Sequence, residues 1–140
     1  MRFWDASALV PLLVEQHLSK RMAEYAAKDP HMFTWWGSAV ECASAICRLE
    51  REKLLGPEEA NLAFVRLREL AAGWNEINPG EALREHALRL LRVHALRASD
   101  ALQLAAVHYA AEQRPSTLEF VCLDERLALA AVREGFPVVN

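Results

Sequence analysis

The chain has 140 residues, 53% hydrophobic and 25% charged, a balance that fits one globular domain spanning residues 1–140. Sixteen Lys and Arg against 19 Asp and Glu give a net charge of −3, so long-range attraction to nucleic acid is excluded and any such binding must be local. No apolar stretch is long enough for a membrane span, and Asp5 and Glu15 interrupt the region where a signal peptide is apolar, so we expect a cytoplasmic protein.

Short apolar runs alternate with amphipathic helices along the chain, which predicts an α/β fold. The expected strands lie at residues 2–4, 32–36, 74–79, 118–123 and 136–139. The expected helices lie at residues 6–16, 18–28, 38–53, 57–72, 80–96, 96–110 and 124–135. Pro11 is expected to bend the first helix or to close it near residue 10. Strands this short and apolar, separated by helices, indicate a mostly parallel sheet that is buried on both faces.

Two of the expected strands run directly into a carboxylate. Asp5 follows the strand at 2–4, and Asp124 follows the strand at 118–123. Ligands of parallel sheets bind outside the carboxyl ends of the strands, so both acids are candidate site residues. The alternative is that each acid only caps the helix that follows it.

Glu41 lies inside the apolar segment SAVECASAI, residues 38–46. At helical spacing its neighbours are small or polar: Gly37, Ser44, Ala45 and Arg48. Such a face leaves room for a ligand to approach, whereas the alternative is an exposed position on a half-buried helix.

Asp100 is the one carboxylate of LRASDALQLAAVHYA, residues 96–110. A structural explanation is available, because Ser99 would cap the helix and Asp100 would complement the positive end of its dipole. Together with the other three acids, however, Asp100 makes four carboxylates on four separate elements. We therefore expect them to converge.

Four carboxylates gathered without a partner repel one another at a cost of several kcal/mol. A divalent cation removes that cost, and all-oxygen ligation selects a hard ion such as Mg²⁺ or Mn²⁺. The chemistry most often built in this way is metal-assisted attack of water on a phosphodiester.

Other metal chemistry has little support in the sequence. The odd number of cysteines, Cys42, Cys47 and Cys122, has no C-x-x-C spacing, which favours reduced, buried thiols over disulfides or zinc. The five histidines form no H-E-x-x-H pattern, and we interpret them as surface or core residues. His94 is the one closest to the helix that carries Asp100.

The segments FWDASALV, SAVECASAI, LRASDALQLAA and FVCLDERLALAA occur in this order over essentially the whole chain. Together they resemble the PIN-domain ribonucleases, specifically the VapC-type toxins of bacterial toxin–antitoxin pairs. The resemblance implies a PIN-like three-layer α/β/α sandwich whose catalytic and metal-binding quartet is Asp5, Glu41, Asp100 and Asp124. It also implies Mg²⁺ as the cofactor, with Mn²⁺ as a possible substitute.

The resemblance further implies an endoribonuclease that hydrolyses RNA to products with 5′-phosphate and 3′-hydroxyl ends. Its expected partners are a cognate VapB-type antitoxin and a second copy of the chain. Ser7 would support the pocket at its edge, and Arg97 would contact a phosphate or tether the acids unless it is only a solvated first-turn residue. The chain departs from the family at Cys122, where members often carry Thr or Ser.

Two other functional classes stay open. A haloacid-dehalogenase-like phosphatase would use the acid after the first strand as a nucleophile, but that class needs a late lysine and this chain has none after Lys53. A non-catalytic PIN-like interaction module would be expected to have lost the acids, and all four are present.

Overall fold

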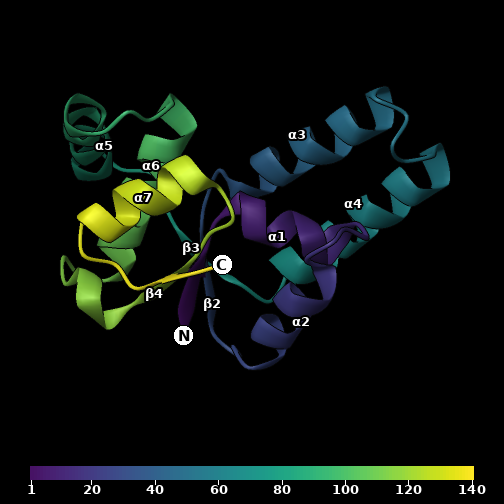
Figure 1. Ribbon diagram of the computed structural model, residues 1–140, viewed down its shortest axis with the longest axis horizontal. Helices are drawn as coiled ribbons and strands as arrows, with labels where there is room; N and C mark the ends of the chain where they lie inside the picture. Colours follow the sequence, from purple (N-terminus) through teal and green to yellow (C-terminus); the bar gives the residue numbers. More distant parts are fainter.

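The computed structural model describes residues 1–140 as seven α-helices and five short strands (Figure 1). The strands are β1 (Arg2–Trp4), β2 (Met32–Trp35), β3 (Asn75–Ile77), β4 (Glu119–Val121) and β5 (Val138–Val139). The helices are α1 (Ala6–Leu13), α2 (Ser19–Ala27), α3 (Ser38–Arg51), α4 (Pro57–Ala71), α5 (Glu81–Val93), α6 (Ala98–Ala110) and α7 (Glu125–Arg133). A 3₁₀ turn, Pro115–Thr117, precedes β4.

The five strands form one sheet in the order β3-β2-β1-β4-β5, and every pair of neighbours is parallel. From the central β1 the chain first builds outward through β2 and β3, and then returns to the other side of β1 with β4 and β5. The winding direction therefore reverses between β1 and β4. In open parallel sheets a crevice forms at this reversal, outside the carboxyl ends of the two strands.

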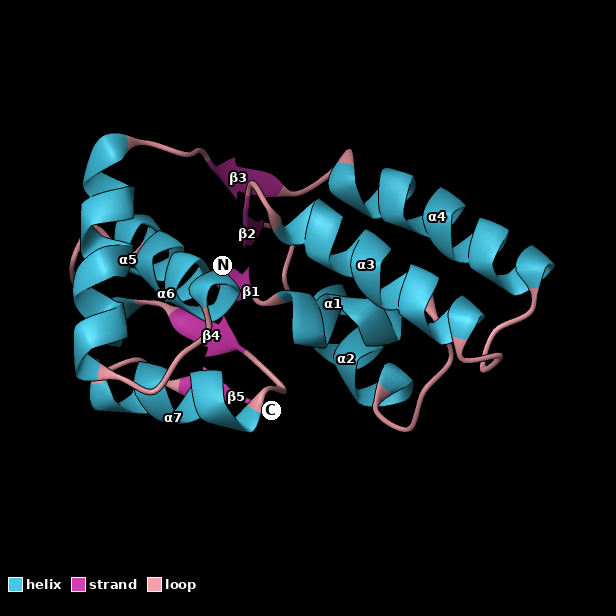
Figure 2. Cartoon of the chain, turned by 90° about the horizontal axis from the view of Figure 1, so that it is seen from above, coloured by secondary structure: helices cyan, strands magenta, loops and turns pink.

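Helices cover both faces of the sheet, as Figure 2 shows. Alternation along the strands divides the core in two, because successive side chains of a strand point to opposite faces. Phe3 and Phe120 belong to the cluster that includes α5, α6 and α7, while Trp4 and Val121 belong to the cluster that includes α1 to α4. The predicted PIN-like three-layer α/β/α sandwich with a parallel sheet is confirmed.

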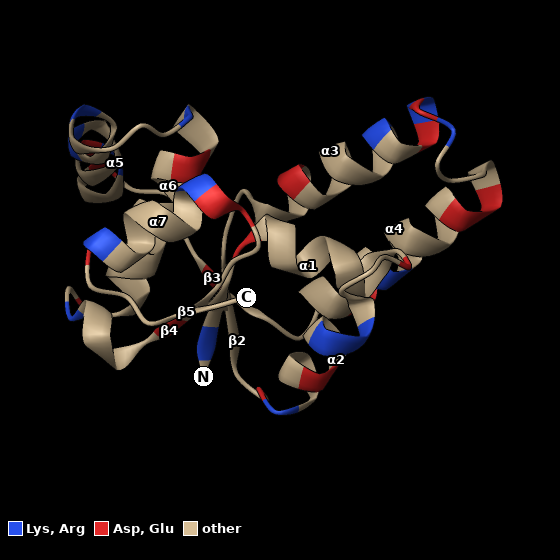
Figure 3. Cartoon of the chain, viewed as in Figure 1, with Lys and Arg blue, Asp and Glu red and all other residues tan.

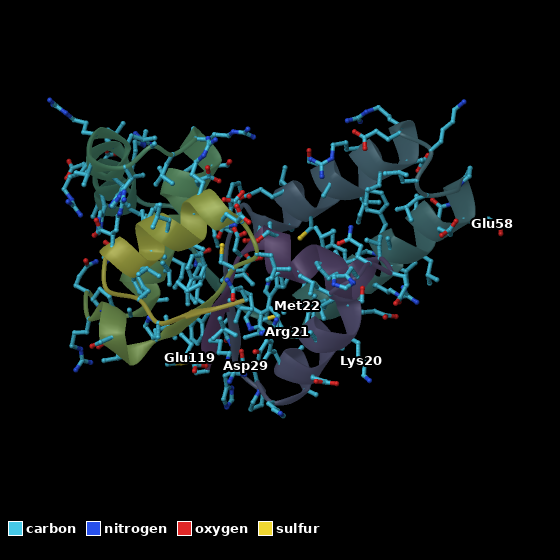
Figure 4. All side chains as sticks on the ribbon, viewed as in Figure 1. Lys20, Arg21, Met22, Asp29, Glu58 and Glu119 are labelled. Carbon is cyan, nitrogen blue, oxygen red and sulfur yellow. The ribbon has the colours of Figure 1, made fainter.

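Polar contacts close the amino-terminal edge of the sheet. The Arg2 guanidinium pairs with Glu119, which joins the starts of β1 and β4. Buried Asp29 accepts a hydrogen bond from Trp4 Nε1 at 2.8 Å and lies 3.1 Å from the amino terminus. Asp29 and Glu119 are labelled at this end of the molecule in Figure 4.

The predicted elements are all present, but α1 and α5 each end three residues earlier than the sequence pattern predicts, and four other helices end one or two residues early. The first helix does not close near residue 10, because α1 continues through Pro11 to Leu13 and buries six of its eight residues. That burial outweighs the hydrogen bond that proline removes, since each buried aliphatic side chain contributes about 1.5–3 kcal/mol. Helix α1 ends before the exposed residues 15–17. Helix α5 ends at Val93, because the backbone of His94 is extended.

None of the seven helices combines the length and the hydropathy that a crossing of a lipid bilayer requires.

Candidate active site

Asp5 lies where β1 ends and α1 begins, and only 4% of its surface is exposed. Its Oδ2 accepts hydrogen bonds from the Ser7 amide at 3.0 Å and from the Ser7 hydroxyl, so the capping role weighed from the sequence is present. Burial raises the pKa of the Asp5 carboxyl above its usual range; the Ser7 bonds oppose that shift, and the charge of Asp124 adds to it. A buried carboxylate with a raised pKa is stabilised by a nearby cation.

Ser7 joins the start of α1 to the segment after β4. While its hydroxyl donates to Asp5, it accepts from the backbone amides of Leu123, at 2.9 Å, and Asp124, at 3.2 Å. The Ser7 hydroxyl therefore holds both the Asp5 carboxylate and the backbone at residues 123–124.

Asp124 is the N-cap of α7, and its Oδ1 accepts the Leu127 amide hydrogen at 2.8 Å. This capping bond matches the structural alternative that the sequence offered for this acid. Its charge also contributes to the raised pKa of Asp5.

Glu41 projects from the first turn of α3 and is half-buried. Burial is the largest cause that raises the pKa of its carboxyl to about 7, and the negative charges of Asp5 and Asp100 raise it further. The hydrogen bond from Gln103 acts in the opposite direction. Two of the other predicted acids, Asp5 and Asp100, therefore contribute to the raised pKa of Glu41.

Gln103 is the residue of this region that the sequence analysis missed. It is fully buried one turn after Asp100 on α6, and its Nε2 donates to Glu41 Oε1 and to Ser38 Oγ, both at 3.2 Å. Its Oε1 is buried without a hydrogen-bond partner. The available signal was a single amide inside the apolar run ALQLAA, three residues after Asp100.

The prediction that Ser99 caps the helix of Asp100 is wrong. The N-cap is Arg97, and Asp100 Oδ2 accepts the Arg97 backbone N–H at 3.0 Å. Ser99 falls inside the first turn, because α6 begins at Ala98. Asp100 therefore stabilises the start of its own helix with one oxygen.

Cys122 occupies the position where the resembling family often has a hydroxyl. Its Sγ lies 3.8 Å from Asp5 Oδ2 and 3.5 Å from the Asp124 carbonyl oxygen. Burial, followed by the charge of Asp5, raises the pKa of the Cys122 thiol. The same two causes, with Glu41, raise the pKa of Cys42 to about 12. Both thiols are therefore protonated at neutral pH, and neither acts as a nucleophile.

The four acids form a connected electrostatic group at the carboxyl edge of the sheet. Asp124 acts on Asp5, and Asp5 and Asp100 act on Glu41. Figure 3 shows acidic segments at the start of α3, on α6 and at the start of α7, in the upper middle of the view. No three His, Cys, Asp or Glu side chains lie close enough together to hold a metal ion in this structure, so the convergence of all four acids on one ligand stays a prediction.

The donor set nevertheless has the chemistry of a Mg²⁺ or Mn²⁺ site. In each acid the hydrogen bonds described above fall on one oxygen, namely Asp5 Oδ2, Glu41 Oε1, Asp100 Oδ2 and Asp124 Oδ1. The second oxygen of each carboxylate is left for a ligand. Mg²⁺ usually keeps several waters and takes only one or two carboxylates, so a closed cage of side chains is not required.

The small and polar face predicted around Glu41 borders a hollow of about 290 Å³. Ser7, Gln16, Ala45 and Arg48 are among the residues that line it with Glu41. Of the predicted face, Gly37 and Ser44 are not part of its lining. The expected access to Glu41 is therefore present, between α1 and α3.

His94 belongs to a separate network at the opposite ends of α6 and α7 from the acids. Its Nε2 lies 2.6 Å from Glu134 Oε1. His108 Nε2 lies 3.2 Å from Glu134 Oε2, at ion-pair distance, and the His86 ring is 4.5 Å from the His108 ring between centroids. This network joins α5, α6 and the end of α7, so the contact that His94 makes links helices to one another and lies away from the acids.

Comparison with known proteins identifies the fold. No protein-family model matches the chain, and no curated protein matches it either. Among solved structures, the chain is similar to a toxin–antitoxin complex from Klebsiella pneumoniae, with 19% identity and a TM-score of 0.66 over 100% of this chain and 97% of that one. The fold is therefore one that a bacterial toxin–antitoxin system uses.

Two further solved structures agree. VapC20 of Mycobacterium tuberculosis, described as a sarcin–ricin loop cleaving toxin, has 19% identity and a TM-score of 0.69 over 97% of this chain and 96% of that one. FitAcB of Neisseria gonorrhoeae has 16% identity and a TM-score of 0.66 over 100% and 97%. At these identities the likeness establishes a common fold along nearly the whole of each chain.

Proposed function

We propose that this protein is a metal-dependent endoribonuclease of the VapC type and the toxin of a toxin–antitoxin pair. The observation that carries the proposal is that Asp5 and Asp124 follow β1 and β4, on the two sides of the reversal point of the sheet, and that the Ser7 hydroxyl links Asp5 to the backbone of Asp124. The fold shared with a toxin described as cleaving the sarcin–ricin loop supports RNA as the substrate.

In this proposal Asp5, Glu41, Asp100 and Asp124 hold Mg²⁺ or Mn²⁺. When bound, the cation supplies positive charge for the scissile phosphate and lowers the pKa of a coordinated water. The Ser7 hydroxyl keeps Asp5 oriented, and the Gln103 amide keeps Oε1 of Glu41 in place.

With Oε1 held, Glu41 has Oε2 left to accept a hydrogen bond from an attacking water. The water oxygen forms a bond to phosphorus while the bond from phosphorus to the 3′-oxygen breaks. The water gives up a proton to Glu41, and the 3′-oxygen takes up a proton from solvent, so the products carry a 5′-phosphate and a 3′-hydroxyl.

The proposal includes an antitoxin partner. One similar structure is a toxin–antitoxin complex, and another is FitAB bound to a DNA fragment. A cognate VapB-type antitoxin would silence this chain by covering its acidic site. We also propose that two copies of the chain form a homodimer, as the family resemblance implies.

The test is cleavage of a mixed RNA pool by the purified protein with Mg²⁺, with Mn²⁺ and with a chelator. The variant is Asp100→Asn, because asparagine still accepts the Arg97 N–H and keeps the helix start. Glu81→Gln, which changes a first-turn acid of α5, is the matched control.

We expect metal-dependent cleavage by the wild type and by Glu81→Gln, and a loss of at least about 100-fold in Asp100→Asn with an unchanged unfolding curve. If the wild type cuts nothing and calorimetry detects no metal binding, the chain is a non-catalytic interaction module. If Asp100→Asn loses activity because it unfolds, Asp100 is only a helix cap.

A further inference from the structure

A hollow lies beside Asp100 and Asp124, between the start of α6 and α7. Its volume is about 770 Å³, within the roughly 300–1,000 Å³ of clefts that bind small ligands. It is lined by Arg97, Ser99, Asp100, Leu123, Asp124, Glu125, Arg126 and Leu129. We call it the arginine hollow. Asp100 and Asp124 reach it, so a molecule bound there touches two of the four acids.

Two arginines line this hollow with unpaired guanidinium groups, Arg97 at the N-cap of α6 and Arg126 in the first turn of α7. Arg97 and Arg126 are both exposed, and neither side chain forms an ion pair or a hydrogen bond with any residue of the chain. By contrast, Arg84 pairs with an acid on its own helix and Arg89 pairs with Glu134. Asp100, Asp124 and Glu125, the three acids of the lining, form no ion pair with Arg97 or Arg126. Both guanidinium groups are therefore available to an external anion.

An apolar surface lies next to these cations. Leu123 and Leu129 are the two hydrophobic residues of the lining, and Leu129 is 51% exposed. Arg126 and Leu129 are three residues apart on α7, so they share one face of the helix. This face offers a cation to a phosphate and an apolar side chain to a base.

The hollow between α1 and α3 is a weaker candidate for the same role. It is smaller, about 290 Å³, and Arg48 is its only arginine. A chain with a net charge of −3 needs local cations to hold a polyanion. The arginine hollow provides two, beside the carboxylates of Asp100, Asp124 and Glu125.

We propose that the arginine hollow binds the nucleotide next to the scissile phosphate of a single-stranded RNA. Arg97 and Arg126 hold its phosphate from two sides, and Leu129 packs against its base. The proposal rests on the ribonuclease function proposed above. It adds the contacts that fix the position of the substrate, because phosphate contacts set the register of a nucleic acid on a protein.

The test compares two double variants that remove the same charge. Arg97→Gln with Arg126→Gln removes both cations of the hollow, while Arg92→Gln with Arg133→Gln removes two exposed, unpaired arginines elsewhere on α5 and α7. Binding of a fluorescein-labelled single-stranded RNA of mixed sequence is measured by anisotropy, with chelator, between about 50 and 200 mM salt. Cleavage is measured separately with Mg²⁺ under single-turnover conditions.

We expect the hollow variant to bind RNA about tenfold more weakly. Its plot of log affinity against log salt should be shallower by about 0.7, since both arginines hold the same phosphate and each neutralised phosphate contributes about 0.7. The concentration for half-maximal cleavage rises by the same factor. The Arg92 and Arg133 control stays within about twofold of wild type. Leu129→Ser weakens binding without changing the salt slope, because its contact is apolar.

The outcomes separate this proposal from the proposed function. A wild type that cuts RNA, with a hollow variant no different from the control, overturns the arginine hollow alone. A wild type that binds RNA through the hollow but never cuts it overturns the nuclease function and keeps the site. If the wild type does not bind RNA, the RNA site is refuted.

Discussion

Acidification should destabilise this protein through His108, a residue of the network around Glu134. Its side chain is 7% exposed, packed 4.8 Å from the Phe136 ring between centroids. Burial is the main cause that lowers the pKa of His108 from 6.5 to about 4; neighbouring His86 and, less, Arg89 lower it, while Glu134 acts in the opposite direction. His94 also contacts Glu134. The folded state therefore binds a proton at His108 more weakly than the unfolded state does.

The sign and size follow from this difference. Between pH 6.5 and about 4 the unfolded chain takes up a proton at His108 that the folded chain rejects, so stability is full above pH 6.5 and falls as the pH drops. Since one pKa unit corresponds to about 1.4 kcal/mol, the loss is about 3 kcal/mol. The lowered pKa of Glu134 adds a further loss in the same direction, below about pH 4.5.

Urea unfolding at a series of pH values measures this effect, with His108→Gln as the variant and His31→Gln, at an exposed position, as the control. Glutamine does not titrate, so the loss of unfolding free energy between pH 7 and 4 should be smaller by about 3 kcal/mol in His108→Gln. The substitution also removes the contact of His108 with Glu134, which changes the stability at pH 7. The prediction therefore concerns the slope with pH and not the stability at pH 7. Parallel pH curves for wild type and His108→Gln would refute the reasoning.

Two further predictions concern the candidate site. Ser7→Ala removes the acceptor of two backbone amides and should lower the free energy of unfolding, measured in urea, by about 1–2 kcal/mol. The control Ser116→Ala, in the exposed 3₁₀ turn, should stay within about 0.5 kcal/mol of wild type. Equal losses in the two variants would contradict the prediction. Gln103→Leu removes a buried oxygen that has no partner, so the free energy of unfolding should change by less than about 1 kcal/mol. RNA cleavage should fall at least about tenfold, because Glu41 loses the donor that orients it. Cleavage at the wild-type rate would show that Gln103 is only a packing residue.

The sequence predicted the order and type of the elements because these depend on residues a few positions apart. Apolar periodicity located all seven helices and all five strands. The helix ends were less accurate. Pro11 did not close α1, and Ser99 did not cap α6, since burial of α1 and the bond between Asp100 and the Arg97 amide decided those positions. Such errors are confined to a few residues at each end.

The candidate acids could be identified from the sequence for the same local reason. Asp5 and Asp124 each follow an apolar strand, and in a parallel sheet such positions share one edge. Gln103 could not be assigned a role, because its partner Glu41 lies 62 positions away. The network of Glu134 with three histidines was missed as well, since it joins α5, α6 and the end of α7.

By itself, the sequence determined which residues form helices and strands and which four carboxylates lie at their ends. Only the tertiary structure decided that the strands pair in the order β3-β2-β1-β4-β5, which places Asp5 and Asp124 on the two sides of one reversal point. It also decided which oxygen of each acid the protein holds, and that Arg97 and Arg126 line one hollow. The physical reason is range: capping and periodicity act within a turn or two, whereas strand pairing, burial and the sharing of a ligand depend on contacts between residues far apart in the chain.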